Sequence, residues 1–281
     1  MTRIAIVTDS TAYIPENLRA QYNIYVAPQQ LIWGTETFRD GVDITPTQFY
    51  QRLRVDKVNP KTSQVSPGAF KDLLIKALQG ADAVLAIVIS SKLSQTLNSA
   101  SVAKADMPDA QIEVVDSRMT AMAMGFICIA AAKAAAEGKT LAEVKKLAED
   151  SIAKVGVIFV VDTLDYLHRG GRIGGAQRLI GNALNVKPVL ELRDGRVEPL
   201  ERVRTKKKAV QYMINNIADR VAGKSGLRLA TLHCDAENEA RELLSEAPKR
   251  LNATETVFAE VSPVIGTHTG PGTVGLAWIT D

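Results

Sequence analysis

The chain has 281 residues, of which 46% are hydrophobic and 23% are charged. This is the balance of a globular protein with a sizeable core, which excludes a disordered chain, and the length suits one large domain or two of ordinary size. The net charge of +3 falls short of the clustered basic stripe of nucleic-acid-binding proteins, so we expect no nucleic-acid partner.

The first residues lead directly into a β-rich run at 4–7, without the basic lead and apolar stretch of a secretory signal, so we expect a cytoplasmic protein. The most apolar stretch, 121–132, is shorter than the roughly 18 residues that cross a bilayer, and we predict a buried helix there. Cys128 and Cys234 have no further ligands at metal-binding spacing. We therefore expect reduced thiols, no metal and no cofactor.

Short β-branched runs, each closed by a hydroxyl or acidic residue and followed by a helical stretch, recur along the chain. They lie at residues 4–8, 84–89, 112–115 and 157–161. Strands that alternate with helices predict a parallel sheet covered on both faces, with ligands in the crevice at the carboxyl ends of the strands. The clearest predicted helix begins at Ser66-Pro67 and ends at Gly80.

The pattern changes after about residue 157. A Gly-rich stretch precedes an extended run at 187–204, and Asp194-Gly195 within that run predicts a β-hairpin. A predicted helix at 206–221, strand at 228–232 and helix at 237–251 complete a second lobe. We therefore predict an α/β fold of two lobes, an N-terminal parallel-sheet α/β domain at 1–157 and a C-terminal α/β domain at 158–281.

Three stretches are candidate binding segments. The stretch at 266–275 places four glycines around His268. Because glycine lets the backbone approach a ligand closely, we expect a loop there with a ligand-facing His268. A purely structural turn is the alternative. Thr62 and Ser63 precede a predicted helix N-terminus, where they can seat an anion or cap the helix. Ser94 opens another predicted helix and has the same two interpretations.

Standard catalytic patterns are absent. There is no G-x-S-x-G motif, the stretch at 168–175 lacks dinucleotide-loop spacing, and Gly223-Lys224-Ser225 has Ala218 where a phosphate-binding loop requires glycine. We therefore expect a binding protein without turnover of its own. The alternative is an enzyme, a phosphotransferase or hydrolase, that uses the same hydroxyls and His268 on a small anionic substrate. A DNA-binding regulator would need a recognition helix that the sequence does not offer.

Five motifs in chain order resemble the DegV family: DST at 9–11, TSQ at 62–64, SSKLSQT at 90–96, LDYLHRGGRIG at 164–174 and GTHTGPG at 266–272. The resemblance spans the whole chain. It implies a two-lobed α/β fold that holds a long-chain fatty acid, such as palmitate, stearate or oleate, between the lobes, in lipid transport or fatty acid metabolism. It also implies the acyl-carrying subunit of a bacterial fatty acid kinase, with the kinase subunit as partner.

Carried over residue by residue, the resemblance puts the carboxylate at Thr62 and Ser94, with His268 and Arg204 nearby as polar or cationic partners. The full implied fatty-acid site comprises Thr62, Ser63, Ser94, Arg204, His268 and Gly270. The sequence departs from the family pattern at Tyr13, where Asp is frequent, and at Gln95, where Gly is usual.

Two further segments have two interpretations each. The apolar helix at 119–136 carries Met122 and Met124, which adapt to irregular guests, so it forms a wall of the tail tunnel or an ordinary core helix. Three lysines at 206–208 occupy a first helical turn, where the helix dipole disfavours positive charge. They form a solvated face or dock to a kinase or, transiently, to an anionic membrane surface.

Overall fold

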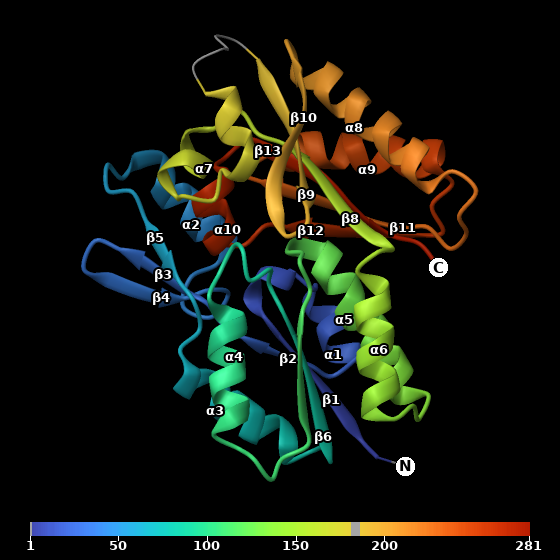
Figure 1. Cartoon of the computed structure of the whole chain (residues 1–281). Coiled ribbons are helices and arrows are strands. Elements are labelled where there is room, and N and C mark those ends of the chain that lie inside the picture. The colour runs from blue at the N-terminus through green and yellow to red at the C-terminus, as the bar shows by residue number, and fades with distance from the viewer. Residues whose placement is uncertain (1, 181–185) are drawn as a thin grey trace.

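The computed structural model describes residues 2–180 and 186–281. It contains a four-stranded sheet, a six-stranded sheet and a small three-stranded sheet. Figure 1 shows the two larger sheets in two lobes, one built mainly from the N-terminal half of the chain and the other from the C-terminal half. This arrangement confirms the predicted two-lobed α/β fold.

The N-terminal lobe contains a parallel sheet of strand order β2-β1-β6-β7. Its strands are β1 (Ile4–Asp9), β2 (Ile24–Ala27), β6 (Ala83–Val88) and β7 (Ile112–Asp116), and η1 (Ser10–Ala12) and α1 (Glu16–Gln21) link β1 to β2. One face packs against α3 (Pro67–Leu78) and α4 (Thr96–Ala105), the other against α5 (Ala121–Ala136) and α6 (Leu141–Ser151). Every residue of β6 is buried, which is why this strand is an unbroken apolar run.

A small antiparallel sheet of order β4-β3-β5 lies beside this lobe. Its strands are β3 (Gln30–Trp33), β4 (Glu36–Arg39) and β5 (Lys61–Ser63), and α2 (Pro46–Val55) connects β4 to β5. The sequence did not predict these strands, because three or four residues are too few to show a periodicity. The sheet brings β5 against the helix α10 (Pro263–Thr269) of the C-terminal half.

The C-terminal lobe contains a mixed sheet of order β10-β9-β8-β13-β11-β12. Its strands are β8 (Val155–Val160), β9 (Lys187–Arg193), β10 (Arg196–Val203), β11 (Arg228–Cys234), β12 (Glu255–Glu260) and β13 (Thr273–Ile279). The long helices α8 (Lys206–Val221) and α9 (Glu237–Leu251) pack on this sheet, and the shorter α7 (Asp165–Arg169) and η2 (Gly174–Leu179) follow β8. Asp194 and Gly195 both have positive φ, as the predicted hairpin turn requires.

One strand differs from the predicted pattern. The run at 157–161 was expected to continue the parallel sheet, but β8 pairs antiparallel with both β13 and β9. The strand is buried along its whole length, and a buried apolar run does not record the direction of its neighbours. The predicted boundary at 157 therefore falls inside β8, a strand of the second sheet.

Helix α5 lies where the lobes meet (Figure 1), in contact with β1 and β6 on one side and with β8 and β13 on the other. Met122 and Met124 are completely buried in the central hydrophobic core. The core-helix interpretation therefore holds for most of this segment. Among residues 2–180 and 186–281, no helix has the length and apolar character needed to cross a membrane.

Candidate functional site

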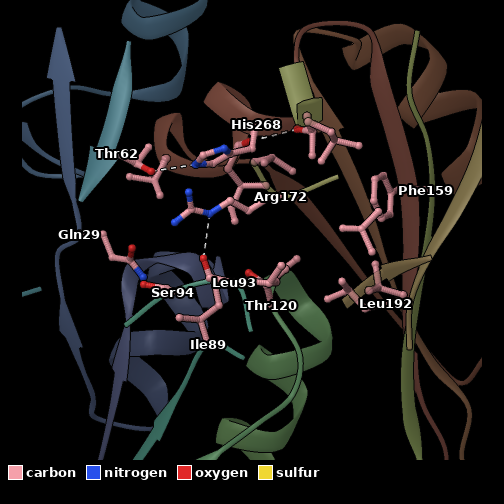
Figure 2. Close-up of a pocket in the computed structure, with 18 of the residues that line it drawn as sticks. Gln29, Thr62, Ile89, Leu93, Ser94, Thr120, Phe159, Arg172, Leu192 and His268 are labelled. Atoms are coloured by element: carbon pink, nitrogen blue, oxygen red, sulfur yellow. Dashed lines mark hydrogen bonds between the residues drawn. The ribbon is translucent and has the colours of Figure 1, made fainter. Parts of the chain in front are cut away.

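A cavity lies between the lobes, with an apolar wall and a polar end. The apolar wall includes Phe159 and Leu192 from the second sheet, and the polar side chains include Thr62, Ser94 and Arg172. Figure 2 shows these two groups on opposite sides of the cavity. Of the predicted tail helix, only the segment at 120–121 reaches the lining. Apart from one arginine, the lining residues that the structure describes carry no charge, so the cavity suits a largely apolar ligand with one polar end.

Thr62 and Ser63 line the cavity from strand β5. The helix that follows is capped by Ser66, whose Oγ accepts a hydrogen bond from the backbone N–H of Ala69 at 3.2 Å. The two earlier hydroxyls are therefore not caps. They lie on a strand and not at the helix N-terminus, so any anion at this point must be bound by side chains rather than by the helix end.

The stretch at 266–275, predicted as a loop, begins as a helix. Ser262 and Pro263 start α10, with proline at the first helical position. A Cβ at Gly266 would collide with Tyr50, so this glycine allows the helix to pack closely. Gly270 ends the helix at a φ of 78° but does not line the cavity. The prediction of a loop was wrong for Gly266. Glycine usually disfavours a helix, but here the helix packs so closely against Tyr50 that a residue with a Cβ does not fit, and the sequence does not show this contact.

His268, near the end of α10, lines the polar end of the cavity. Its Nε2 hydrogen-bonds with the Thr62 hydroxyl, as the dashed line in Figure 2 shows. Burial, together with the positive charge of Arg172, lowers the pKa of His268 to about 4, so the imidazole is neutral near pH 7. Its Nδ1 is buried and has no hydrogen-bond partner among the described residues.

Arg172 is the cation of the cavity, and the sequence analysis missed it. Its Nε donates to the carbonyl of Leu93 at 3.0 Å and its Nη1 to the carbonyl of Gly170 at 2.8 Å. No carboxylate among residues 2–180 and 186–281 pairs with it, so its positive charge is available to an anionic ligand. The sequence offers one signal, an arginine within the Gly-rich stretch at 168–175, but that stretch lacks dinucleotide-loop spacing, and glycine spacing alone does not indicate a guanidinium at a binding site.

Ser94 and Gln95 line the cavity just before α4. Oγ of Ser94 lies 2.9 Å from Oγ1 of Thr96 and also accepts a bond of 3.3 Å from the backbone N–H of Thr96. Gln95, a departure from the family pattern, occupies the N-cap position but makes no capping hydrogen bond. Both side chains are therefore close enough to contact a ligand head group.

The structure does not bring Arg204 to the polar end. Arg204 borders a separate surface hollow beside Asp162 and Arg202. Val197, which does line the cavity, lies near the hairpin turn in β10, whereas Arg204 lies just beyond the other end of that strand. Arg204 is seven positions further along the chain, which corresponds to about 23 Å of extended chain. The sequence could not show that only the turn end of this hairpin faces the cavity.

The lysines at 206–208 are not simply a solvated face. Nζ of Lys206 donates to the carbonyl of Gly272 and lies 3.2 Å from a carboxylate oxygen of Glu239. Lys207 and Lys208 have no such described contacts and remain on the surface of the first turn of α8.

A buried carboxyl, Asp40, connects the lobes near the start of α10. Its Oδ2 accepts hydrogen bonds from the hydroxyls of Ser10 and Ser262, each at 2.6 Å. Tyr13, the other departure from the family pattern, has its hydroxyl 3.3 Å from Oγ of Ser262. Burial raises the pKa of Asp40 to about 6. Because Ser262 precedes the helix that carries His268, these bonds help to fix that helix.

The described residues contain no group of three or more His, Cys, Asp or Glu suited to a metal ion. Both cysteines are unpaired thiols, and burial raises the pKa of Cys234, which lines the cavity, to about 11. A thiol with this pKa stays protonated near neutral pH and is a poor nucleophile.

Comparison with known proteins gives consistent matches over the whole chain. The family model "Uncharacterised protein, DegV family" matches residues 3–281. A DegV domain-containing protein of Streptomyces coelicolor is 41% identical over 276 residues, 97% of each chain. A fatty-acid-binding DegV family protein from Thermus thermophilus has a TM-score of 0.92 and 36% identity, covering 99% of this chain and 100% of its own. DegV of Bacillus subtilis, a fatty acid binding protein, has a TM-score of 0.92 and 33% identity, covering 100% of both chains.

Proposed function

The chain belongs to the DegV family. We propose that it binds a long-chain fatty acid in the bacterial cytoplasm and presents the carboxylate of that fatty acid to a partner. The tail, from palmitate, stearate or oleate, occupies the apolar cavity between the lobes. The head lies at Thr62, Ser94 and Arg172. The fatty-acid-binding character of the similar Thermus thermophilus and Bacillus subtilis proteins supports this assignment.

The observation that carries the proposal is that Arg172 is the single charge among the cavity-lining residues that the structure describes. A tail of roughly 15 methylene groups gains about 0.8 kcal/mol for each group buried, so the apolar wall supplies most of the binding free energy. A buried carboxylate without a partner is strongly unfavourable, so the site must supply a cation and hydrogen-bond donors. Arg172 supplies the charge, because His268 is neutral near pH 7.

The carboxylate is the group that a partner would act upon. We assign to a separate kinase subunit the transfer of a phosphoryl group: a carboxylate oxygen bonds to the phosphorus of the donor, and the bond between that phosphorus and its leaving oxygen breaks. The carrier contributes binding and orientation and has no turnover of its own. Lys207 and Lys208 are candidates for docking to this partner or, transiently, to an anionic membrane from which the lipid is exchanged.

A second candidate function, an enzyme acting on a small anionic substrate, has one observation in its favour. Thr62 and His268 form a hydroxyl–imidazole pair of the kind that activates nucleophiles. In such sites a third group orients the imidazole, but Nδ1 of His268 has no partner among the described residues. Hydrolysis or phosphoryl transfer by the purified chain alone would favour the enzyme.

Mass spectrometry of an organic extract tests the main proposal. The purified chain and a control protein from the same host are extracted in parallel, and fatty acids are quantified against protein. We expect one long-chain fatty acid per chain and none above background in the control, and the extract then gives the preferred chain length directly. A chain that carries no lipid, and takes none up from defined fatty acids after delipidation, would contradict the proposal.

A further inference from the structure

A second hollow, with a cavity volume of about 400 Å³, lies at the carboxyl ends of β11 and β12. These strands pair in parallel and α9 connects them, so they form a β-α-β unit, in which ligands bind beside the carboxyl ends of the strands. Side chains alternate between the two faces of β11: His233 lines this hollow, whereas Leu232 and Cys234 line the apolar cavity. The hollow is therefore separate from the cavity between the lobes.

His233 is buried, with 3% of its surface exposed, and neither of its ring nitrogens has a hydrogen-bond partner among the described residues. Buried polar atoms without partners are unfavourable, and nearly all such atoms in proteins are paired. Burial also lowers the pKa of His233, so its imidazole is neutral near pH 7 and one ring nitrogen can accept a hydrogen bond. The ring therefore has an unused acceptor at the hollow.

The second hollow is acidic, and we call it the acidic hollow. Its described lining contains one guanidinium and four carboxylates, those of Asp235, Glu237, Glu239 and Glu260. Three of these carboxylates have a basic partner nearby. The distances are 2.8 Å from Arg54 to Asp235, 2.8 Å from Arg241 to Glu237 and 3.2 Å from Lys206 to Glu239.

Glu260 is the fourth carboxylate, and no cation of the described residues forms an ion pair with it. Burial and the neighbouring carboxylates of Glu237 and Asp235 raise its pKa. Glu260 is the register partner of His233 in the parallel pair, so the two side chains leave the sheet on the same face, from strands about 4.8 Å apart. A cation with several N–H groups would satisfy both the carboxylate and the imidazole nitrogen.

We propose that the acidic hollow binds a small hydrophilic primary amine whose ammonium group donates hydrogen bonds to His233 and Glu260. An ammonium group supplies three N–H donors and the missing positive charge. The volume lies in the range of small-molecule pockets. The described residues offer no group of three or more His, Cys, Asp or Glu suited to a metal ion, so an amine fits better than a metal. Neutral polar side chains for a second polar group of the ligand are those of Thr47, Gln51 and Asn238.

The first test is a titration followed by nitrogen NMR of the imidazole rings, since the chain has only three histidines. The probe is 3-aminopropan-1-ol. Propane-1,3-diol lacks its charge, and (3-hydroxypropyl)trimethylammonium keeps the charge but has no N–H. We expect the amine to shift the ring signals of His233, assigned with His233→Gln, and to leave those of the exposed His168 in place. No shift at His233, or an equal shift with either analogue, would overturn the proposal.

The second test removes the charge of one carboxylate. Glu260→Gln should weaken amine binding by about tenfold or more, because a charge-assisted hydrogen bond is lost. Glu255→Gln is the matched control, at an exposed position on the same strand outside the hollow, and should bind the amine like the wild type. Wild-type amine affinity in Glu260→Gln would contradict the assignment. The wild-type titration of His233 decides the question even if this variant does not fold.

Two further measurements separate the alternatives. Magnesium chloride at matched ionic strength should not displace the amine, and displacement at equal concentration would overturn the assignment to an amine. Palmitate affinity should be unchanged in Glu260→Gln, because this residue does not line the apolar cavity. The site is independent of the proposed function: if that function fails, the wild type binds no palmitate, but the amine still shifts the signals of His233.

Discussion

Nε2 of His268 lies 2.8 Å from Oγ1 of Thr62, although 206 positions separate the two residues in sequence. The hydrogen bond joins the last helix of the chain to the small sheet of the N-terminal half. The polar end of the cavity is therefore complete only when both halves are folded against each other. A ligand carboxylate that bonds the Thr62 hydroxyl must share it with His268.

The two hydroxyl residues should contribute modestly to lipid affinity. Replacing Thr62 with Val, or Ser94 with Ala, removes one hydrogen bond to a charged head group, so we expect each change to weaken fatty acid binding by about tenfold. Thermal unfolding of Ser94→Ala should stay close to that of the wild type, whereas Thr62→Val should also lower the free energy of unfolding by about 1–3 kcal/mol, because it leaves Nε2 of the buried His268 without its partner. Competition binding with palmitate measures the effect. Ser101→Ala, on the exposed side of α4, is the control, and wild-type affinity in both site variants would remove them from the head-group site.

Arg172 should contribute to lipid affinity through its contact with the carboxylate and not through the tail. We expect Arg172→Gln to weaken palmitate binding by about tenfold or more, because it removes the one charge found among the described lining residues. Its affinity for the uncharged methyl ester of palmitate should change far less. Equal losses for the acid and the ester would show that the substitution acts on the fold of the cavity instead.

Arg204 provides the matched comparison for Arg172. It lies outside the cavity, so Arg204→Gln should keep palmitate affinity within about twofold of the wild type, as is usual for surface substitutions. The same competition assay measures it. A loss as large as that of Arg172→Gln would restore the residue assignment that the family resemblance implied.

The buried imidazole should make stability depend on pH. The pKa of His268 is about 4 in the folded protein against an ordinary value of 6.5. Between these values the unfolded chain binds a proton here and the folded chain does not, so the stability contribution is complete above pH 6.5 and is lost as the pH falls towards 4. From about pH 7 to about pH 4, the wild type should lose up to about 3 kcal/mol more of its free energy of unfolding than His268→Gln.

Denaturant titrations of the two proteins across this pH range measure the difference. Asp40 has the opposite effect, because its pKa is raised from 3.8 to about 6 in the folded protein. Between these values the folded chain binds a proton here and the unfolded chain does not, so Asp40 adds stability as the pH falls. It is present in both proteins, so its contribution cancels in the comparison. The exposed His168 offers a control variant, His168→Gln, and parallel pH curves for wild type and His268→Gln would contradict the prediction.

A glycine should hold the imidazole in place. A Cβ at Gly170 would overlap Nδ1 of His268, so Gly170→Ala must displace the ring and disturb its bond to Thr62. We expect a loss of roughly 1–3 kcal/mol in the free energy of unfolding, typical of overpacking, together with weaker palmitate binding. Gly68→Ala is the control, because its Cβ would meet no atom within 4 Å. Wild-type stability and affinity in Gly170→Ala would show that the ring has room to move.

Elements whose signals lie within a few residues can be predicted from the amino-acid sequence alone. Ser66-Pro67 predicted the start of α3, and Asp194-Gly195 predicted the turn of the β9–β10 hairpin. The unbroken apolar run of β6 predicted a strand buried on both faces. Such signals can be read in the chain because capping, turn geometry and side-chain burial act locally.

Which side chains meet in the cavity depends on long-range packing. Arg172 is held by a carbonyl 79 positions away, and the direction of β8 follows from its pairing with the last strand. The same long-range packing leaves Arg204 outside the cavity and brings Thr62 to His268. A linear pattern identifies the residue types that suit a carboxylate, but distances across the space between two lobes are set by packing, which no local signal encodes.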